Sequence, residues 1–259
     1  MYGLILMRSF ILVLFYACWF CSAFAQPAKA SLPATANVTL ERVMQAHLAA
    51  LGDVGKLQSR RVKLRIIGMA PFEIPTTVEA KRPNLLRRDV LVQGQTQVSA
   101  YDGKDAWKID PFLTSGKKAV DLSAEELPAM LEESYFDGIL MAAQKLGFPL
   151  QYAGMEKLDE RRVHVLKVSI PATGESTIYL DADSFLEIKR LQKRPVMGRM
   201  TELEVYTSDY RLHDGLMVAY RFEIGTKGSA QRMSMVVDAV ENNPVIAASR
   251  FQRAANLAN

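Results

Sequence analysis

The chain has 259 residues with a formal net charge of +4, two cysteines and three histidines. Its basic pairs, such as Arg60-Arg61 and Arg87-Arg88, are dispersed among acidic residues rather than clustered with stacking aromatic side chains, which argues against a nucleic-acid-binding surface. The histidines are isolated, and no G-x-S-x-G, H-E-x-x-H or phosphate-binding Gly-rich loop is present, so the usual hydrolase, zinc-enzyme and nucleotide-binding schemes lack their residues. We therefore expect a protein that is not an enzyme, with no cofactor and no metal site.

The N-terminal segment has the pattern of a secretory signal peptide. Arg8 is followed by an apolar run from Phe10 to Phe20 and then by the small-residue pattern Ala23-Phe24-Ala25. We expect residues 1–25 to be cleaved, which removes both cysteines, leaves 234 of the 259 residues and lowers the net charge from +4 to +3. An uncleaved membrane anchor and a lipid-modified Cys18 are the alternatives.

Residues 26–38 are rich in small residues and predict a linker. A helix is predicted over residues 40–51, because apolar side chains recur there at helical spacing. Thr39 can cap its N-terminus and Gly52 its C-terminus. His47 lies on the apolar stripe of this helix, and we expect it to be a packed histidine rather than a ligand.

Alternating apolar and polar residues, interrupted by turn residues, dominate the rest of the chain. A helical interlude begins at the capping box Ser123-Ala124-Glu125-Glu126 and continues in apolar patches at 127–131 and 139–146. Strands are predicted at 62–70, 74–82, 85–93, 95–101 and 105–110, near 150, and at 161–170, 175–181, 185–193, 200–212, 216–226 and 230–240.

These elements predict a mainly β (α+β) fold, an antiparallel sheet of about eleven or twelve strands in one domain over residues 39–250, with a tail at 251–259. A sheet of this length must curl, and we expect an incomplete β-barrel whose apolar face encloses a cavity. Alternation selects the residues expected to line the cavity and contact an acyl chain: Leu64, Ile66, Val78, Val90, Val92, Trp107, Ile109, Met130, Leu131, Leu140, Val218, Tyr220, Phe222, Met233 and Met235.

Arg82 conflicts with this pattern. In the stretch TTVEAKRPN, it falls on the same face as Thr76, Val78 and Ala80, so a permanent charge ends the apolar side of a strand. Either the side chain reaches solvent at the rim, or a polar partner inside the barrel compensates it, because a buried unpaired charge is too costly.

Four segments together resemble a known family. KRPNLLR, starting at Lys81, and YDGKDAWKIDPF, starting at Tyr101, resemble consecutive early strands of periplasmic lipoprotein carriers of the LolA/LolB-like superfamily. VMQAHLAALGDVGKLQS and YTSDYRLHDGLMVAYRFEI resemble the first helix and a late hairpin of the broader outer membrane lipoprotein-sorting group. The resemblance implies a half-barrel with helices forming a lid over an apolar cavity. It also implies that Arg82, the arginine of the R-P motif, latches the lid.

The resemblance implies a soluble, monomeric periplasmic carrier that binds the acyl chains of lipoproteins or lipids and delivers them toward the outer membrane. Its partners would be that acylated cargo and membrane donor and acceptor proteins. A non-transporting sensor or scaffold domain that binds lipoprotein in the cell envelope is the alternative. The insert from Leu122 to Phe148 has its own sequence and departs from the carriers, so the motifs do not identify the cargo.

Overall fold

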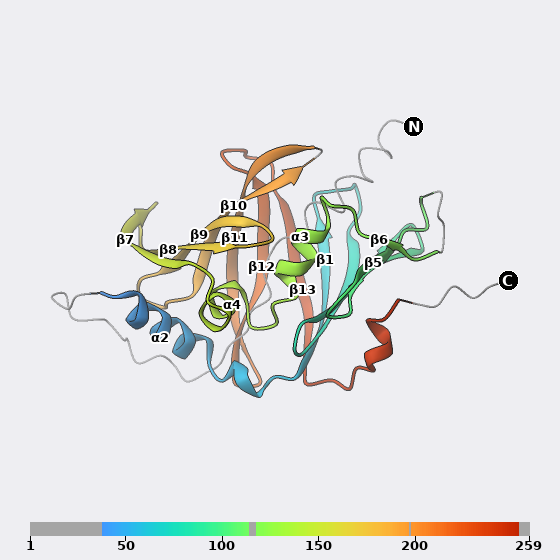
Figure 1. Cartoon of the computed structure of the whole chain (residues 1–259). Helices are drawn as coiled ribbons and strands as arrows, with labels where there is room; N and C mark the ends of the chain where they lie inside the picture. Colours follow the sequence, from blue (N-terminus) through green and yellow to red (C-terminus); the bar gives the residue numbers. More distant parts are fainter. Residues whose placement is uncertain (1–37, 114–117, 197, 254–259) are drawn as a thin grey trace.

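Thirteen antiparallel strands form one sheet in the computed structural model, which describes residues 38–113, 118–196 and 198–253 (Figure 1). The proposed signal peptide, nearly all of the linker and the end of the tail lie outside these residues. The strands are β1 (Ser59–Ile67), β2 (Ile74–Lys81), β3 (Leu85–Val92), β4 (Gln95–Tyr101), β5 (Ala106–Ile109), β6 (Val120–Asp121), β7 (Leu150–Leu158), β8 (Arg161–Ile170), β9 (Gly174–Asp181), β10 (Glu187–Val196), β11 (Arg199–His213), β12 (Leu216–Thr226) and β13 (Met233–Asn242).

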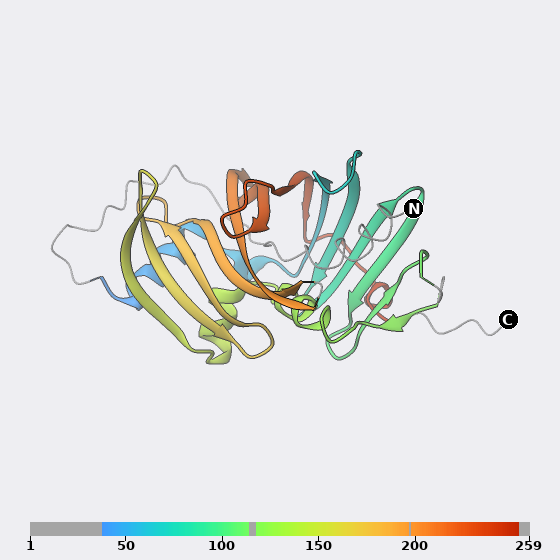
Figure 2. The ribbon, with the colours of Figure 1, turned by 90° about the horizontal axis from the view of Figure 1, so that it is seen from above.

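The order of the strands explains the shape of the sheet. They run β6-β5-β4-β3-β2-β1-β13-β12-β11-β10-β9-β8-β7, so β1 pairs with β13 in the middle and β6 and β7 form the two edges. The edges do not pair with each other, and the sheet curves without closing (Figure 2). This confirms the predicted incomplete barrel. The predicted strand count misses β6, since two residues are too few to show an alternating pattern.

Helix α2 (Leu40–Leu51) begins and ends where the sequence predicts. The Thr39 hydroxyl accepts a hydrogen bond from the Arg42 backbone N–H at 3.3 Å, and Gly52 ends the helix at φ 81°. His47 is buried, with Nδ1 2.8 Å from the Phe185 carbonyl oxygen, and burial lowers the pKa of its imidazole. The expectation of a packed histidine is confirmed.

The helical insert, residues 122–148, connects the two edge strands β6 and β7. Because these strands lie at opposite ends of the sheet, the insert has to cross the open side of the half-barrel. It contains α3 (Leu127–Glu133), which contacts β4, and α4 (Ile139–Leu146), which contacts β7 and β8. Figure 1 shows both helices in front of the sheet. We call the covered side the inner face.

The apolar core is divided between the two halves of the sheet. One cluster joins β1–β3, β12 and β13 with Met130 of α3. A second cluster joins Val43 and Met44 of α2 and Leu140 of α4 to the inner side of β8 and β9. The helices therefore contribute to the core at both ends of the insert.

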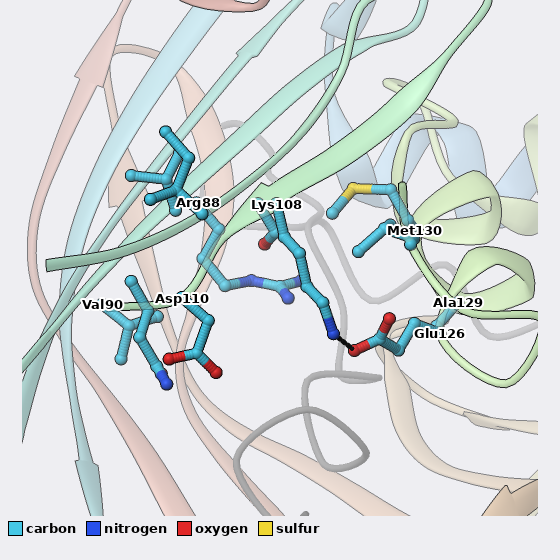
Figure 3. A pocket seen from close by; sticks show the side chains of 12 residues that line it. Arg88, Val90, Lys108, Asp110, Glu126, Ala129 and Met130 are labelled. Carbon is cyan, nitrogen blue, oxygen red and sulfur yellow. Dashed lines mark hydrogen bonds and ion pairs between the residues drawn. The ribbon is translucent and has the colours of Figure 1, made fainter. Parts of the chain in front are cut away.

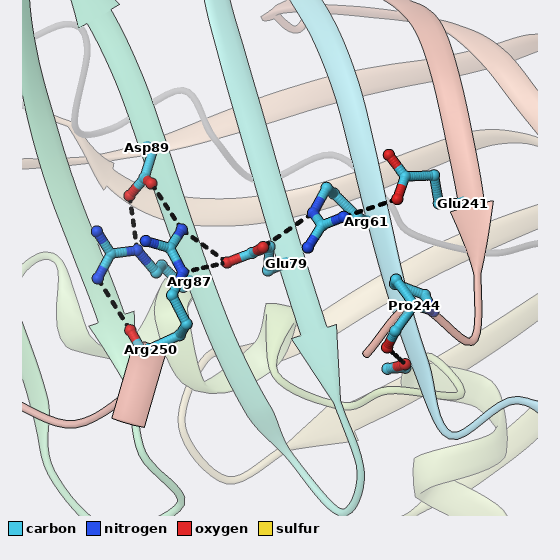
Figure 4. Close-up of polar contacts among 8 residues, drawn as sticks. Arg61, Glu79, Arg87, Asp89, Glu241, Pro244 and Arg250 are labelled. Carbon is cyan, nitrogen blue, oxygen red and sulfur yellow. Dashed lines mark hydrogen bonds and ion pairs between the residues drawn. The ribbon is translucent and has the colours of Figure 1, made fainter. Parts of the chain in front are cut away.

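The outer face of β1–β5 is crossed by the C-terminal segment, residues 243–253, which includes the short 3₁₀ helix η2 (Ala248–Arg250). Arg250 pairs there with Glu79 and Asp89, and the Glu79 carboxylate also accepts from Arg61 (Figure 4). Another 3₁₀ turn, η1 (Val54–Lys56), follows α2. Within the described ranges, no helix is both long and apolar enough to span a bilayer.

Candidate functional site

The inner face of β1–β3 is apolar, as the alternation predicts. Direct cross-strand pairs put Val62 beside Val78 and Leu64 beside Thr76, and paired residues in an antiparallel sheet share a face. Most of the predicted lining residues are buried together in the larger cluster on this side: Leu64, Ile66, Val78, Val90, Val92, Met130, Val218, Tyr220, Phe222, Met233 and Met235.

The other four predicted lining residues lie elsewhere. Leu140 belongs to the second cluster, and Leu131 is half-buried on α3 outside both clusters. Trp107 and Ile109 pack in a separate cluster with Val98 and Ala100.

The prediction that Trp107 lines the cavity is wrong. Trp107 pairs with Ala100, whereas its neighbour Lys108 pairs with Ser99 and shares the inner face. Trp107 therefore points outward, and its indole N–H donates to the Phe251 carbonyl oxygen at 2.9 Å. The sequence did not reveal that the C-terminal segment creates a second apolar layer on the outer face, in which a tryptophan can be fully buried.

Two spaces lie beside the insert on the inner side of the half-barrel. Their volumes are about 40 Å³ and 30 Å³. A cavity of about 150 Å³ holds one benzene molecule, so neither of these two spaces accommodates an acyl chain. The first is also less apolar than expected, because Arg88 and Lys108 from the sheet and Glu126 from the insert line it beside Val90 and Met130 (Figure 3).

Arg82 holds the insert by several hydrogen bonds. Its Nη1 donates to Asp137 Oδ2 at 2.6 Å, and its Nη2 pairs with Oδ1 of the same carboxylate. The guanidinium also donates from Nε to the Leu57 carbonyl at 2.6 Å and from Nη2 to the Val54 carbonyl at 3.2 Å, and it lies 4.7 Å from the centre of the Phe136 ring. Asp137 lies between α3 and α4. The charge that ends the apolar face of β2 is thus paired with the insert.

Acidic residues of α3 and its N-terminal turn make further ion pairs with the sheet. Glu133 pairs with Arg88 of β3, and Glu126 pairs with Lys108 of β5. On the other half of the sheet, Glu132 Oε2 lies 2.5 Å from Nη2 of Arg194, in β10.

The Glu132 carboxylate contacts a second cation besides Arg194, because its Oε1 lies 3.6 Å from Nη1 of Arg190. We call the pairs made by Asp137, Glu133, Glu126 and Glu132 the clasp. Of its members, sequence reasoning found only Arg82. The available signal was the position of Arg88 between Leu86 and Val90, which puts a second cation on the apolar side of a strand.

The charge of Glu133 is disfavoured by its burial in the clasp. Burial, and to a smaller extent neighbouring Glu132, raise the pKa of its carboxyl, Arg88 and Arg194 oppose the shift, and the resulting pKa is about 7. Near neutral pH this carboxyl is therefore divided between its neutral and ionised forms.

Comparison with solved structures identifies the fold. A LolA superfamily protein from Nitrosomonas europaea matches with a TM-score of 0.58 and 13% identity, over 83% of this chain and 98% of that chain. The protein has the LolA-superfamily fold. A DUF1329 family protein from Desulfovibrio piger matches with a TM-score of 0.57 and 10% identity, over 83% of this chain and 98% of that one.

A putative outer membrane lipoprotein-sorting protein domain from Vibrio parahaemolyticus also has this fold, with a TM-score of 0.55 and 12% identity over 81% of this chain and 94% of that chain. At these identities, the likeness concerns the LolA-superfamily fold alone. No protein-family model and no curated protein sequence matches the chain significantly. No group of three or more His, Cys, Asp or Glu side chains suited to a metal ion occurs in the part of the chain that the structure describes.

Proposed function

We propose that this protein is a periplasmic carrier that binds the acyl chains of a lipoprotein or lipid on the inner face of its half-barrel and delivers them toward the outer membrane. The observation that carries this proposal is the insert: it joins the two edges of the sheet, covers an apolar face and is tied to that face by a few polar contacts. A covering segment of this kind can be exchanged for cargo. The signal-peptide pattern supports the periplasmic location.

Neither of the two spaces beside the insert has room for an acyl chain in the closed conformation, so binding there requires the insert to move. Burying an acyl chain is worth about 0.8 kcal/mol per methylene, whereas releasing the insert exposes apolar side chains such as Met130 and breaks the clasp. These two terms oppose each other. The net affinity for the acyl chain is therefore lower than it would be for a half-barrel without the insert, and a membrane acceptor protein can take over the cargo.

Arg82 is the proposed latch of this exchange. Its contacts with Asp137 exist only when the insert is closed, whereas its bonds to Leu57 and Val54 lie outside the insert. A ligand that displaces the insert therefore has to outweigh the pair with Asp137, and the free energy of that pair sets part of the gap between the closed and open states.

Native extraction followed by mass spectrometry tests the carrier proposal. The mature protein, purified without detergent, should carry an acylated molecule or bind a polarity-sensitive fatty-acid probe, and Arg82→Leu should change the rate of probe release. If the protein carries no acylated molecule and does not bind the probe, the carrier proposal is wrong.

A non-transporting sensor or scaffold is the second candidate, and the small size of the two spaces beside the insert favours it. In that case, the inner face serves as a core, and partner proteins bind elsewhere. Recovery of one membrane protein in a stable complex, with no bound acyl chain, would support this candidate over the carrier.

A further inference from the structure

The inner face carries cations at positions where an acyl-binding surface needs none. Arg88 pairs across the sheet with Ser99, and Ser99 pairs in turn with Lys108, so the two cations lie in one row over β3, β4 and β5. Arg88 is 7% exposed. Such a position is costly for a charge, and a purely apolar cargo would gain nothing from it.

The insert provides carboxylates to these cations. Glu133 pairs with Arg88 and Glu126 with Lys108, and both acids belong to the segment that has to move for cargo to bind. Displacement of the insert removes both carboxylates from the row. Arg88 and Lys108 then remain on the sheet without these two carboxylates, next to apolar Val90.

We propose that the cargo is an amphiphile with an anionic head group, a carboxylate or a phosphate ester, which takes the place of the Glu133 and Glu126 carboxylates on Arg88 and Lys108. This rests on the proposed carrier function and names the class of ligand for the same site. The acidic side chains of the insert imitate the head group in the closed state. Ligand binding thus exchanges one set of charge-assisted hydrogen bonds for another, instead of leaving buried cations without a counter-ion.

The tendency of Glu133 to be neutral near pH 7 supports its replacement by an anionic head group. Burial raises the pKa of this carboxyl to about 7, so near neutral pH a fraction of the molecules has a neutral group opposite Arg88. A phosphate ester stays ionised under these conditions and offers more acceptor oxygens than a carboxyl group.

Ligands that differ only in head group test the proposal. Palmitate, hexadecyl phosphate and hexadecan-1-ol are titrated against a bound neutral polarity-sensitive acyl probe, with acetate and inorganic phosphate as tail-less competitors. Both anionic ligands should displace the probe at concentrations at least about tenfold lower than hexadecan-1-ol, which corresponds to about 1.4 kcal/mol. Acetate and inorganic phosphate should not displace it.

Two variants connect the preference to the cationic row. Arg88→Gln combined with Glu133→Gln removes both charges of one pair together, so no unpaired charge remains in the core, and Lys108→Gln probes the other end of the row. Each should reduce the preference for the anionic ligands to less than about threefold, by loss of a charged contact. The control is Arg61→Gln, which affects outer-face pairs with Glu79 and Glu241 and should keep the full preference.

The outcomes separate the two proposals. Equal displacement by the acids and the alcohol would overturn the head-group assignment and leave the carrier function intact. Displacement by inorganic phosphate alone would mean a small-anion site and would also overturn the assignment. Failure of all three long-chain ligands, and of the probe itself, would overturn the carrier function.

Discussion

Neutralising Asp137 should release the insert without unfolding the sheet. The variant Asp137→Asn keeps the shape of the side chain and removes the charge that pairs with Arg82 through both carboxylate oxygens. Arg82 keeps its bonds to the Leu57 and Val54 carbonyls, so the change isolates the contact between sheet and insert. Arg82→Leu would lose both kinds of contact.

The structure sets the size of the effect. The Arg82 and Asp137 side chains are 22% and 18% exposed, between a surface pair and a buried one. Exposed pairs contribute about 0–1 kcal/mol, and removing one partner of a fully buried pair costs about 3–5 kcal/mol. We expect a loss of about 1–3 kcal/mol, which corresponds to about a 5- to 150-fold increase in the open population.

Native-state hydrogen exchange measures this population directly. Amides of α3 and α4 should exchange faster in Asp137→Asn by that factor, while amides in β1 and β2 stay close to the wild-type rate. The matched control is Asp238→Asn, because Asp238 also accepts two hydrogen bonds from one arginine, Arg65, but on the exposed side of the sheet. If the α3 and α4 amides exchange in Asp137→Asn as they do in the control, the contact does not latch the insert.

Two further predictions concern the buried side chain of Trp107 on the outer face and the buried carboxyl of Glu133 in the insert. Trp107→Ala should lower the free energy of unfolding by about 3–5 kcal/mol, as expected for a fully buried tryptophan, and leave the affinity for the acyl probe unchanged. Trp107→Phe should lower the free energy of unfolding by less. A weaker affinity for the probe in either variant would mean that Trp107 lines the cavity after all. The raised pKa of Glu133 means that the folded state binds a proton more tightly than the unfolded chain, so this group's stabilisation is complete below pH about 4.5 and is lost as pH rises through about 7, by roughly 3 kcal/mol. Burial lowers the pKa values of His47 and His164, so these two groups make the protein more stable as pH rises to about 6.5, opposite to Glu133. The effect of Glu133 is therefore isolated by measuring the free energy of unfolding against pH, by chemical denaturation, for wild type and Glu133→Gln. Identical pH profiles would refute this role of Glu133.

The sequence by itself determined the architecture. Alternation and turn residues are local signals, and the predicted strands recur in the structure with boundaries shifted by a few residues. Helix α2 follows the same rule, since Thr39 and Gly52 act through backbone groups only a few residues away. The motif around Arg82 also indicated the correct fold.

Only the tertiary structure decided which face of each strand is inside and what neutralises its charges. The alternation around Trp107 is clear, but the inner side of β5 depends on the C-terminal segment, which arrives from more than a hundred residues away. The partners of Arg82 and Arg88 were also beyond local reasoning, because the insert crosses from one edge of the sheet to the other and its acids meet strands distant in sequence. Periodicity gives the direction of a side chain relative to its own strand, whereas burial and charge compensation depend on which segments pack against that strand.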